Sequence, residues 1–461
     1  MARGKKSKTV SLAELFNTTV ELHQKGDLEA AGKLYRAYLA KAPQHARGWT
    51  NYGALLRKLG QYDASIAAHR RALELEPGME NARNNIANAL TDAGQYVEAI
   101  ELREALLEEK PRDLNRIRDL AVSLRGDWQH ERAISLVDEV EERGELTDQG
   151  ELQLQRGLAH LMLGHYTKGF ADFEGRYAGT EVSLPKDVPW PRWQGEEIDG
   201  KRLLILPEQG FGDAILMSRF LPRLSAMGAH VSMVVKKPLQ RLFEDLEGAK
   251  RIVSHARKSD TYDYYTPNMS LPHLVGFDGD QPPPPPRFAI PDNSRQRARA
   301  MVKPFEGRFK VGVVWTGSLT YKANHRRSTG PESFLGLAQV PGVQLFSLYK
   351  GDARDDFLNS GMAGLIMDAC GDDQDFADTA ALIDEMDLMI TTDTAVVHVA
   401  ASMGKPIWNL LSHEGFWLYG AGDATPWYPS MTLFRQKATG DWAELFGRVE
   451  TALRTHLKDN T

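Results

Sequence analysis

A 34-residue spacing runs through the first part of this 461-residue chain. Three sets of positions keep it: the glycines Gly26, Gly60 and Gly94, the small residues Ala31, Ser65 and Ala99, and the prolines Pro43, Pro77 and Pro111. A period of this length fits a helix pair that ends at a proline, with a small residue where its two helices approach each other. Because one such pair cannot bury its apolar face alone, the pattern predicts a helical solenoid.

The turn between the two helices of a pair also recurs in the sequence. Its residues are Gly60-Gln61-Tyr62, Gly94-Gln95-Tyr96 and Gly164-His165-Tyr166. Period and turn resemble those of tetratricopeptide repeats. We expect a basic disordered tail at residues 1–10 and about five repeats over residues 11–177. The last two repeats, around residues 121–140 and 157–176, are expected to drift from the 34-residue step.

Four asparagines are the candidate binding residues of the solenoid. They lie on the first helices of the second and third repeats: Asn51, Asn84, Asn85 and Asn88. An asparagine amide donates and accepts, so a row of them in the concave groove suits the extended backbone of a protein partner. The alternative interpretation is a solvated helix face.

Composition excludes several classes of protein. The chain has 56 basic and 62 acidic residues, and its one basic cluster lies at the terminus, which makes nucleic acid a poor partner. The single cysteine, Cys370, excludes an intrachain disulfide and fits a reducing compartment. No stretch reaches the ~18 consecutive apolar residues of a transmembrane helix. We therefore expect a soluble, cytoplasmic protein.

The second half predicts two α/β domains. A Pro- and Trp-rich linker at residues 178–200 precedes a domain at 201–305 and another at 306–461, which a helix at 442–456 closes. Apolar runs at 202–206, 230–235, 310–315, 343–348, 388–391 and 406–411 predict strands, and residues 214–227 predict a helix. Strands alternating with helices predict parallel sheets, so the expected fold class is α + α/β: a helical solenoid followed by two Rossmann-like domains. Such domains bind ligands at the carboxyl ends of their strands.

The first candidate turn is Glu208-Gln209-Gly210-Phe211-Gly212-Asp213, directly after a strand. A dinucleotide site would need a small residue at Ile215 and an acidic one where Lys236 stands, so a nicotinamide or flavin cofactor is not expected. Gly210 and Gly212 would let the backbone approach a ligand closely. Asp213 at the helix start is either the N-cap or a base that takes a proton from an attacking hydroxyl.

The second candidate turn leads from a strand into a helix and contains Asp393, Thr394, Ala395 and His398. Asp393 or Thr392 would cap the helix, leaving free N–H groups near Thr394 and Ala395 for an anion. His398 lies one turn later on the same face, although a lone histidine there could equally be a core residue.

Two cationic residues follow other strands of the same domain. Lys350 and Arg327 could neutralise a leaving diphosphate, although each could instead be an ordinary solvated surface charge. No acidic or His/Cys cluster with metal-ligand spacing follows a strand, so no metal is expected.

These motifs resemble the heptosyltransferase kind of GT-B glycosyltransferase. Residues 203–206 with Gly212-Asp213-Ala214-Ile215 are similar to that family's opening strand, turn and helix, and residues 393–400 are similar to its Asp-Thr-Gly-x-x-His-Leu-Ala motif, with Ala395 in place of the glycine. Bacterial proteins that join tetratricopeptide repeats to such a transferase resemble nearly the whole chain, including the segments at Trp193, 208–210, 347–351 and 375–380. Some of these relatives are implicated in flagellin glycosylation.

The resemblance implies an inverting, metal-independent glycosyltransferase. It assigns Asp213 as the general base on the acceptor side, and Asp393, Thr394, His398 and Lys350 to the nucleotide-sugar side. The acceptor would be a protein, with flagellin as the candidate, held by the repeats. Whether the transferred sugar is a hexose, heptose or nonulosonic acid stays open. Two alternatives remain: a transferase for a glycan or lipid, and a scaffold that no longer catalyses.

Overall fold

The computed structural model describes residues 11–178, 182–257, 259–279, 281–319, 324–371 and 373–459. The tail predicted at residues 1–10 therefore lies outside the described residues. The chain separates into two compact units, Met1–Val137 and Asp138–Thr461.

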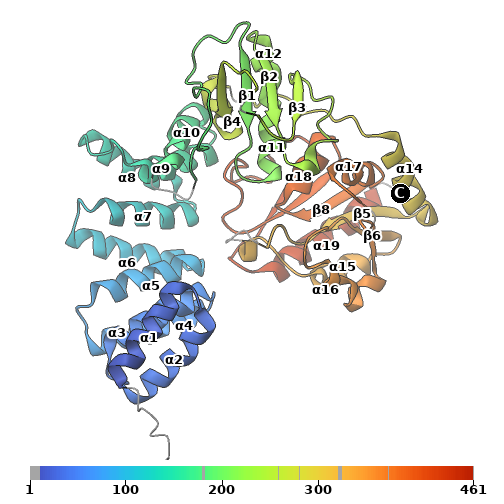
Figure 1. Cartoon of the computed structure of the whole chain (residues 1–461). Coiled ribbons are helices and arrows are strands. Elements are labelled where there is room, and N and C mark those ends of the chain that lie inside the picture. Colours follow the sequence, from blue (N-terminus) through green and yellow to red (C-terminus); the bar gives the residue numbers. More distant parts are fainter. Residues whose placement is uncertain are drawn as a thin grey trace, which may run out of the picture. The chain divides into compact units, whose positions relative to one another are not determined.

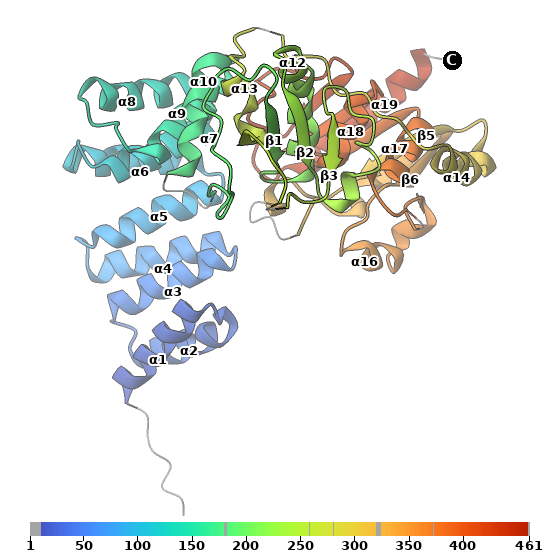
Figure 2. The same cartoon turned by 45° about the horizontal axis from the view of Figure 1, so that its top comes forward.

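The first unit is a stack of helix pairs (Figures 1 and 2). Its helices are α1 (Leu12–Lys25), α2 (Leu28–Lys41), α3 (Ala46–Lys58), α4 (Tyr62–Leu75), α5 (Glu80–Asp92), α6 (Tyr96–Glu109) and α7 (Leu114–Gly126), and α8 (His130–Glu142) crosses the unit boundary. Ala31, Ser65 and Ala99 are fully buried, as the close approach of paired helices requires. The predicted helical solenoid is confirmed.

Glycine at the turn within a pair has a conformational cause. Gly60 and Gly94 have φ of +73° and +74°, in the left-handed region that favours glycine. Trp128 occupies the equivalent place of the fourth pair with φ +62°. The fourth pair was expected to drift, and this was wrong: α7 starts 34 residues after α5, because Trp128 adopts the glycine conformation and preserves the spacing.

The last helix pair belongs to the second unit. It consists of α9 (Gly150–Met162), α10 (Tyr166–Phe173) and the short 3-10 helix η1 (Glu174–Tyr177). Aromatic contacts fix it to the α/β region: the ring of Phe173 stacks on Trp417 with centroids 5.0 Å apart, and Trp427 Nε1 donates to the Tyr166 hydroxyl at 3.1 Å. The pair therefore shares the core of the α/β region.

Two parallel sheets form the rest of this unit. The four-stranded sheet has the order β3-β2-β1-β4 and the six-stranded sheet β10-β9-β8-β5-β6-β7, and every neighbouring pair is parallel. The strands are β1 (Arg202–Leu206), β2 (His230–Val234), β3 (Arg251–Val253), β4 (Tyr264–Pro267), β5 (Phe309–Val314), β6 (Val343–Ser347), β7 (Ile366–Asp368), β8 (Leu388–Thr392), β9 (Ile407–Leu411) and β10 (Met431–Arg435). The two predicted parallel α/β folds are confirmed.

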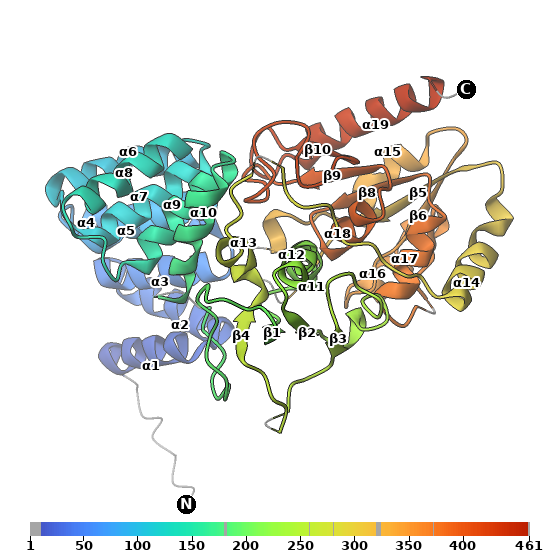
Figure 3. The ribbon, with the colours of Figure 1, turned by 90° about the horizontal axis from the view of Figure 1, so that it is seen from above.

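Helices cover these sheets (Figure 3). They are α11 (Phe211–Met217), α12 (Leu221–Ala226), α13 (Leu271–Leu274), α14 (Asp292–Val302), α15 (Leu335–Ala338), α16 (Arg354–Leu358), α17 (Phe376–Asp384), α18 (Ala395–Ser402) and α19 (Trp442–Asp459). The single helix expected at residues 214–227 is broken between α11 and α12 by a 3-10 turn at Ser218–Phe220. Pro222 explains the break, since its ring clashes with the carbonyl four residues earlier.

Candidate active site

The starts of two helices meet between the sheets. Helix α11 follows β1 and α18 follows β8, and the two helices pack together (Figure 1). A Cβ atom on Gly212 would lie 2.7 Å from Cδ2 of His398 and 3.6 Å from Cα of Ala395. Glycine at 212 was expected to make room for a ligand, but the space it leaves is filled by His398. Gly212 therefore allows the two helix starts to approach each other.

A side chain at position 212 should disturb this contact. We expect Gly212→Ala to lower the free energy of unfolding by about 1–3 kcal/mol, because the His398 ring must move to accept the methyl group. Gly447→Ala is the control, since a Cβ there meets nothing within 4 Å. Urea denaturation measures both, and equal stability of the two variants would contradict a close packing at Gly212.

Gly210 has a different position in the turn from the one expected. It is the N-cap of α11, with φ −94° and ψ −178°, which is extended backbone that any residue adopts. The left-handed residue is its neighbour Gln209, with φ +63°. For a residue with a Cβ this conformation costs roughly 1–2 kcal/mol, so the surrounding contacts must hold it.

Asp213 is therefore not the N-cap. Its Oδ2 accepts a hydrogen bond from the backbone N–H of the N-cap residue Gly210 at 2.8 Å, and this bond stabilises the first turn of α11. Burial raises the pKa of the Asp213 carboxyl, the backbone bond from Gly210 opposes this, Glu208 adds to the rise and Arg327 lowers it. A carboxylate with a raised pKa is a stronger base than an exposed one, as proton abstraction near neutral pH needs.

The start of α18 is also capped differently from the expectation. Thr394, rather than Asp393 or Thr392, is the N-cap, and its side chain makes no capping bond. Thr394 is 9% exposed, and its buried Oγ1 has no hydrogen-bond partner among the described residues. A helix start with an unused buried hydroxyl is suited to an anionic group.

Asp393 and Arg327 lie beside this helix start. Arg327 Nη1 is 3.8 Å from Asp393 Oδ2. Burial raises the pKa of Asp393 to about 6, while Arg327 and a hydrogen bond from Asn409 lower it and the charge of Asp213 raises it. The two aspartates thus influence each other across the meeting point of the helices, with Arg327 near both.

His398 is buried and neutral. Its Nδ1 lies 3.0 Å from the Tyr428 hydroxyl, and the side chain is 4% exposed. Burial, with the charges of Arg219 and Arg327, lowers its pKa to about 3. The ring is therefore a neutral hydrogen-bonding group at physiological pH.

This burial has a consequence for acid stability. The unfolded chain protonates His398 near pH 6.5, whereas the folded chain does so only near 3, so the stability due to the neutral ring is lost as the pH falls below 6.5. When the pH falls from 8 to 5, we expect the free energy of unfolding of His398→Gln to decrease by about 2 kcal/mol less than that of the unsubstituted chain. Urea denaturation at both pH values measures this, with exposed His230→Gln as the control. An unchanged pH dependence would mean that His398 is not buried as a neutral ring.

Lys350 has polar partners of its own within the chain. Its Nζ lies 3.0 Å from Asp373 Oδ2 and donates to the carbonyl of Asp375 at 2.9 Å, at the start of α17. The structure thus gives Lys350 an internal carboxylate partner, which the sequence did not indicate.

The asparagines of the first unit differ among themselves. Asn88 accepts a hydrogen bond from Arg103 at 2.9 Å, and Asn51 bonds Tyr35, so both amides have partners within the repeats. Asn84 and Asn85 are half-buried on α5. The prediction that an asparagine in the concave groove binds a protein partner is therefore strongest for Asn84 and Asn85.

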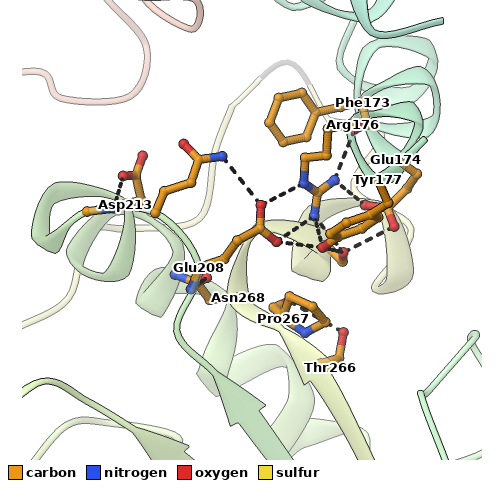
Figure 4. Close-up of polar contacts among 12 residues, drawn as sticks. Phe173, Glu174, Arg176, Tyr177, Glu208, Asp213, Thr266, Pro267 and Asn268 are labelled. Carbon is orange, nitrogen blue, oxygen red and sulfur yellow. Dashed lines mark hydrogen bonds and ion pairs between the residues drawn. The ribbon is translucent and has the colours of Figure 1, made fainter. Parts of the chain in front are cut away.

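A polar network that sequence reasoning missed lies next to Asp213 (Figure 4). The guanidinium of Arg176 in η1 binds both oxygens of Glu208, the residue that follows β1 and Pro207. The sequence predicts no role for Glu208 beyond its place in the turn after the strand. Nothing in the sequence near position 176 signals a partner 32 residues away.

The described residues contain neither a metal-binding cluster nor a helix that could span a membrane. No group of three or more His, Cys, Asp and Glu side chains there is arranged to hold a metal ion. Within the same ranges, every helix is too short or too polar to cross a bilayer.

Comparison with known proteins adds to this geometry. Residues 56–124 match the family model described as "Tetratricopeptide repeat", and residues 348–414 match "Glycosyltransferase family 9 (heptosyltransferase)". The second match contains Lys350, Asp393, Thr394, Ala395 and His398, and Asp213 lies outside it.

Individual relatives match larger parts of the chain. Protein FlbA of Caulobacter vibrioides is 28% identical over 336 residues, which cover 68% of this chain and 56% of FlbA. A glycosyl transferase family 9 structure from Veillonella parvula is 14% identical, with a TM-score of 0.41 over 52% of this chain and 88% of its own. A tetratricopeptide repeat protein from Parabacteroides merdae is 23% identical, with a TM-score of 0.33 over 38% and 68%. The chain thus contains a segment that matches tetratricopeptide repeats and a segment that matches glycosyltransferase family 9.

Proposed function

We propose that this chain transfers a sugar from a nucleotide-sugar to a hydroxyl of a protein acceptor, with inversion and without a metal ion. The observation that supports this most is the meeting of the two helix starts. One carries a carboxylate made more basic by burial, Asp213, and the other carries the unpartnered hydroxyl of Thr394. A base and an anion site side by side are what glycosyl transfer from a diphosphate needs.

On the donor side, the phosphates would bind the free N–H groups at the start of α18 and the Thr394 hydroxyl. Arg327 would neutralise charge that develops on the leaving phosphate. Lys350 could contribute only by leaving Asp373, since the ammonium is already paired. Asp393 repels an anion less when protonated, so we expect nucleotide binding to tighten as the pH falls through about 6.

On the acceptor side, Asp213 would take the proton of the attacking hydroxyl. The acceptor oxygen forms the new bond to the anomeric carbon as the bond to the phosphate oxygen breaks, and the phosphate leaves with that electron pair. Attack from the face opposite the leaving group inverts the anomeric centre. The developing phosphate charge rests on N–H groups and Arg327, which is why we propose no metal.

The repeats support the proposal of a protein acceptor. Stacked helix pairs commonly present a concave surface for extended partners, and Asn84 and Asn85 lie half-buried on α5. Flagellin is our candidate because the chain resembles bacterial proteins that join tetratricopeptide repeats to such a transferase, some of which are implicated in flagellin glycosylation. A glycan or lipid acceptor, or a scaffold without catalysis, are the outcomes that the experiments must exclude.

Calorimetry with the full chain tests the donor site. Uridine, adenosine, guanosine and cytidine nucleotide-sugars are titrated in excess chelator, and we expect one class to bind. Thr394→Val should weaken that binding about tenfold, because it removes a hydroxyl placed for the phosphate. Thr451→Val on α19 is the matched control, as its hydroxyl bonds the carbonyl of Gly447 within the same helix. Binding that requires Mg²⁺ or Mn²⁺, or none with any donor, would contradict the proposal.

A further inference from the structure

We propose that Arg176, from the last helix pair of the repeats, is a positioning residue that clamps Glu208 and so fixes the turn carrying Asp213. Its catalytic meaning rests on the proposed function, whereas the clamp itself can be tested without any substrate.

The guanidinium of Arg176 is enclosed and fully engaged. Arg176 is 1% exposed, its Nε donates to Glu208 Oε1 at 2.8 Å, and its Nη2 donates to Glu208 Oε2 at 3.0 Å. Nη1 donates to Glu174 Oε1 at 2.7 Å and Nη2 to Ser270 Oγ at 2.9 Å (Figure 4). Such a two-point pair fixes the orientation of the carboxylate as well as its position.

Glu208 is held at its backbone as well as at its carboxylate. Its N–H donates to Asn268 Oδ1 at 2.9 Å, and the Tyr177 hydroxyl donates to Oε2 at 2.5 Å. With this residue fixed, the next one, Gln209, is kept in its left-handed conformation. Gly210 follows, and its N–H bonds Asp213. A continuous set of contacts therefore runs from Arg176 to the candidate base.

Stability alone does not explain such a buried pair. Removing two charges from water costs several kcal/mol per ion, and well-packed apolar side chains often replace a buried pair without loss. What apolar residues cannot replace is the orientation that the planar guanidinium imposes on Glu208. Through Arg176 the last repeat pair thus holds the turn that carries Asp213, in addition to packing on the α/β region.

The charges of Arg176 and Glu208 should have opposite effects on the pKa of Asp213. Asp213 faces Glu208 in its own turn, Arg327 after β5 and Asp393 at the end of β8. Glu208 raises the pKa of Asp213, and Arg176 partly neutralises Glu208. Loss of Arg176 should therefore raise the pKa of Asp213, and loss of Glu208 should lower it. A purely structural role would not give opposite shifts.

The test is a pH titration of the full chain, labelled with ¹³C at aspartate, by NMR spectroscopy. The Asp213 carboxyl signal is the one that is missing from the spectrum of Asp213→Asn. Arg176→Gln should raise the measured pKa of Asp213 by about 0.5, and Glu208→Gln should lower it by a similar amount. Arg176→Lys, which keeps the charge and loses the two-point geometry, should leave the pKa nearly unchanged. Hydrogen exchange of residues 207–217 should accelerate about tenfold in all three variants.

Arg156→Gln is the matched control. Arg156 is also a buried arginine of this helix pair, and its ion pairs are with Asp172, Asp138 and Glu141 rather than with the turn at 208–213. Arg156→Gln should lower the free energy of unfolding without changing the pKa of Asp213 or the hydrogen exchange of residues 207–217. Shifts of the same sign in Arg176→Gln and Glu208→Gln, or equal effects of Arg156→Gln, would overturn the proposal. If Arg176→Gln does not fold, Glu208→Gln and Arg176→Lys decide, and neither measurement depends on whether the chain transfers a sugar.

Discussion

Asp213→Asn is expected to lower the transfer rate by about 10²-fold or more while leaving the free energy of unfolding within about 1 kcal/mol. The amide oxygen of asparagine can still accept the Gly210 N–H, so the first turn of α11 stays closed. The amide cannot take up a proton from the acceptor hydroxyl. The measurement is kcat with saturating donor, alongside urea denaturation.

Two further measurements distinguish a catalytic base at Asp213 from a residue with only a structural role. Donor affinity should be nearly unchanged in Asp213→Asn, because the phosphates would bind the start of α18. The rate of the unsubstituted chain should rise with pH through the pKa of Asp213, which burial places above that of an exposed aspartate. Full activity of Asp213→Asn would remove this residue from the mechanism.

Removal of residues 1–145 is expected to abolish acceptor capture and to leave donor affinity almost unchanged. The shortened chain keeps the last helix pair, α9 and α10, whose contacts with Trp417 and Trp427 lie inside the second unit. A partner held by repeats presents its hydroxyl at an effective concentration in the millimolar range for a short tether. Without them the reaction becomes an ordinary bimolecular encounter and slows.

Calorimetry with the donor nucleotide and pull-down of the candidate acceptor make these measurements. The full chain carrying Asn84→Ala and Asn85→Ala is the matched variant, because it keeps every helix and alters only the proposed groove. It should weaken acceptor capture without affecting the donor. Acceptor capture at full strength by the shortened chain would mean that the groove is not the recognition element, and would favour a glycan or lipid acceptor.

The sequence predicted the fold where its patterns are local. Helix pairs follow from spacing, because each repeat contacts only its neighbours. The fourth pair was misjudged because Trp128 adopts a conformation usually reserved for glycine. Four strands were missed, and two of them, β3 and β7, are three residues long, too short for an alternation to be visible.

The site was predicted in part for a similar reason. Rossmann-like domains bind ligands at the carboxyl ends of their parallel strands, so the turns after β1 and after β8, which belong to different sheets, were both expected to contribute to a ligand site. The structure brings Asp213, Asp393 and His398 near one another. The partners of Lys350 and Glu208 could not be predicted, because Asp373 and Arg176 are distant in the sequence and reach them only through the folded packing.

The most direct test of the account is the mass of the acceptor protein. The full chain is incubated with the nucleotide-sugar it binds and with flagellin purified from a strain lacking this gene, in excess chelator, and the acceptor is analysed by intact-mass spectrometry. The account predicts a gain of one or more sugar residues on flagellin that is absent with Asp213→Asn. Release of free sugar with no change in the acceptor mass, or an equal gain with Asp213→Asn, would contradict it.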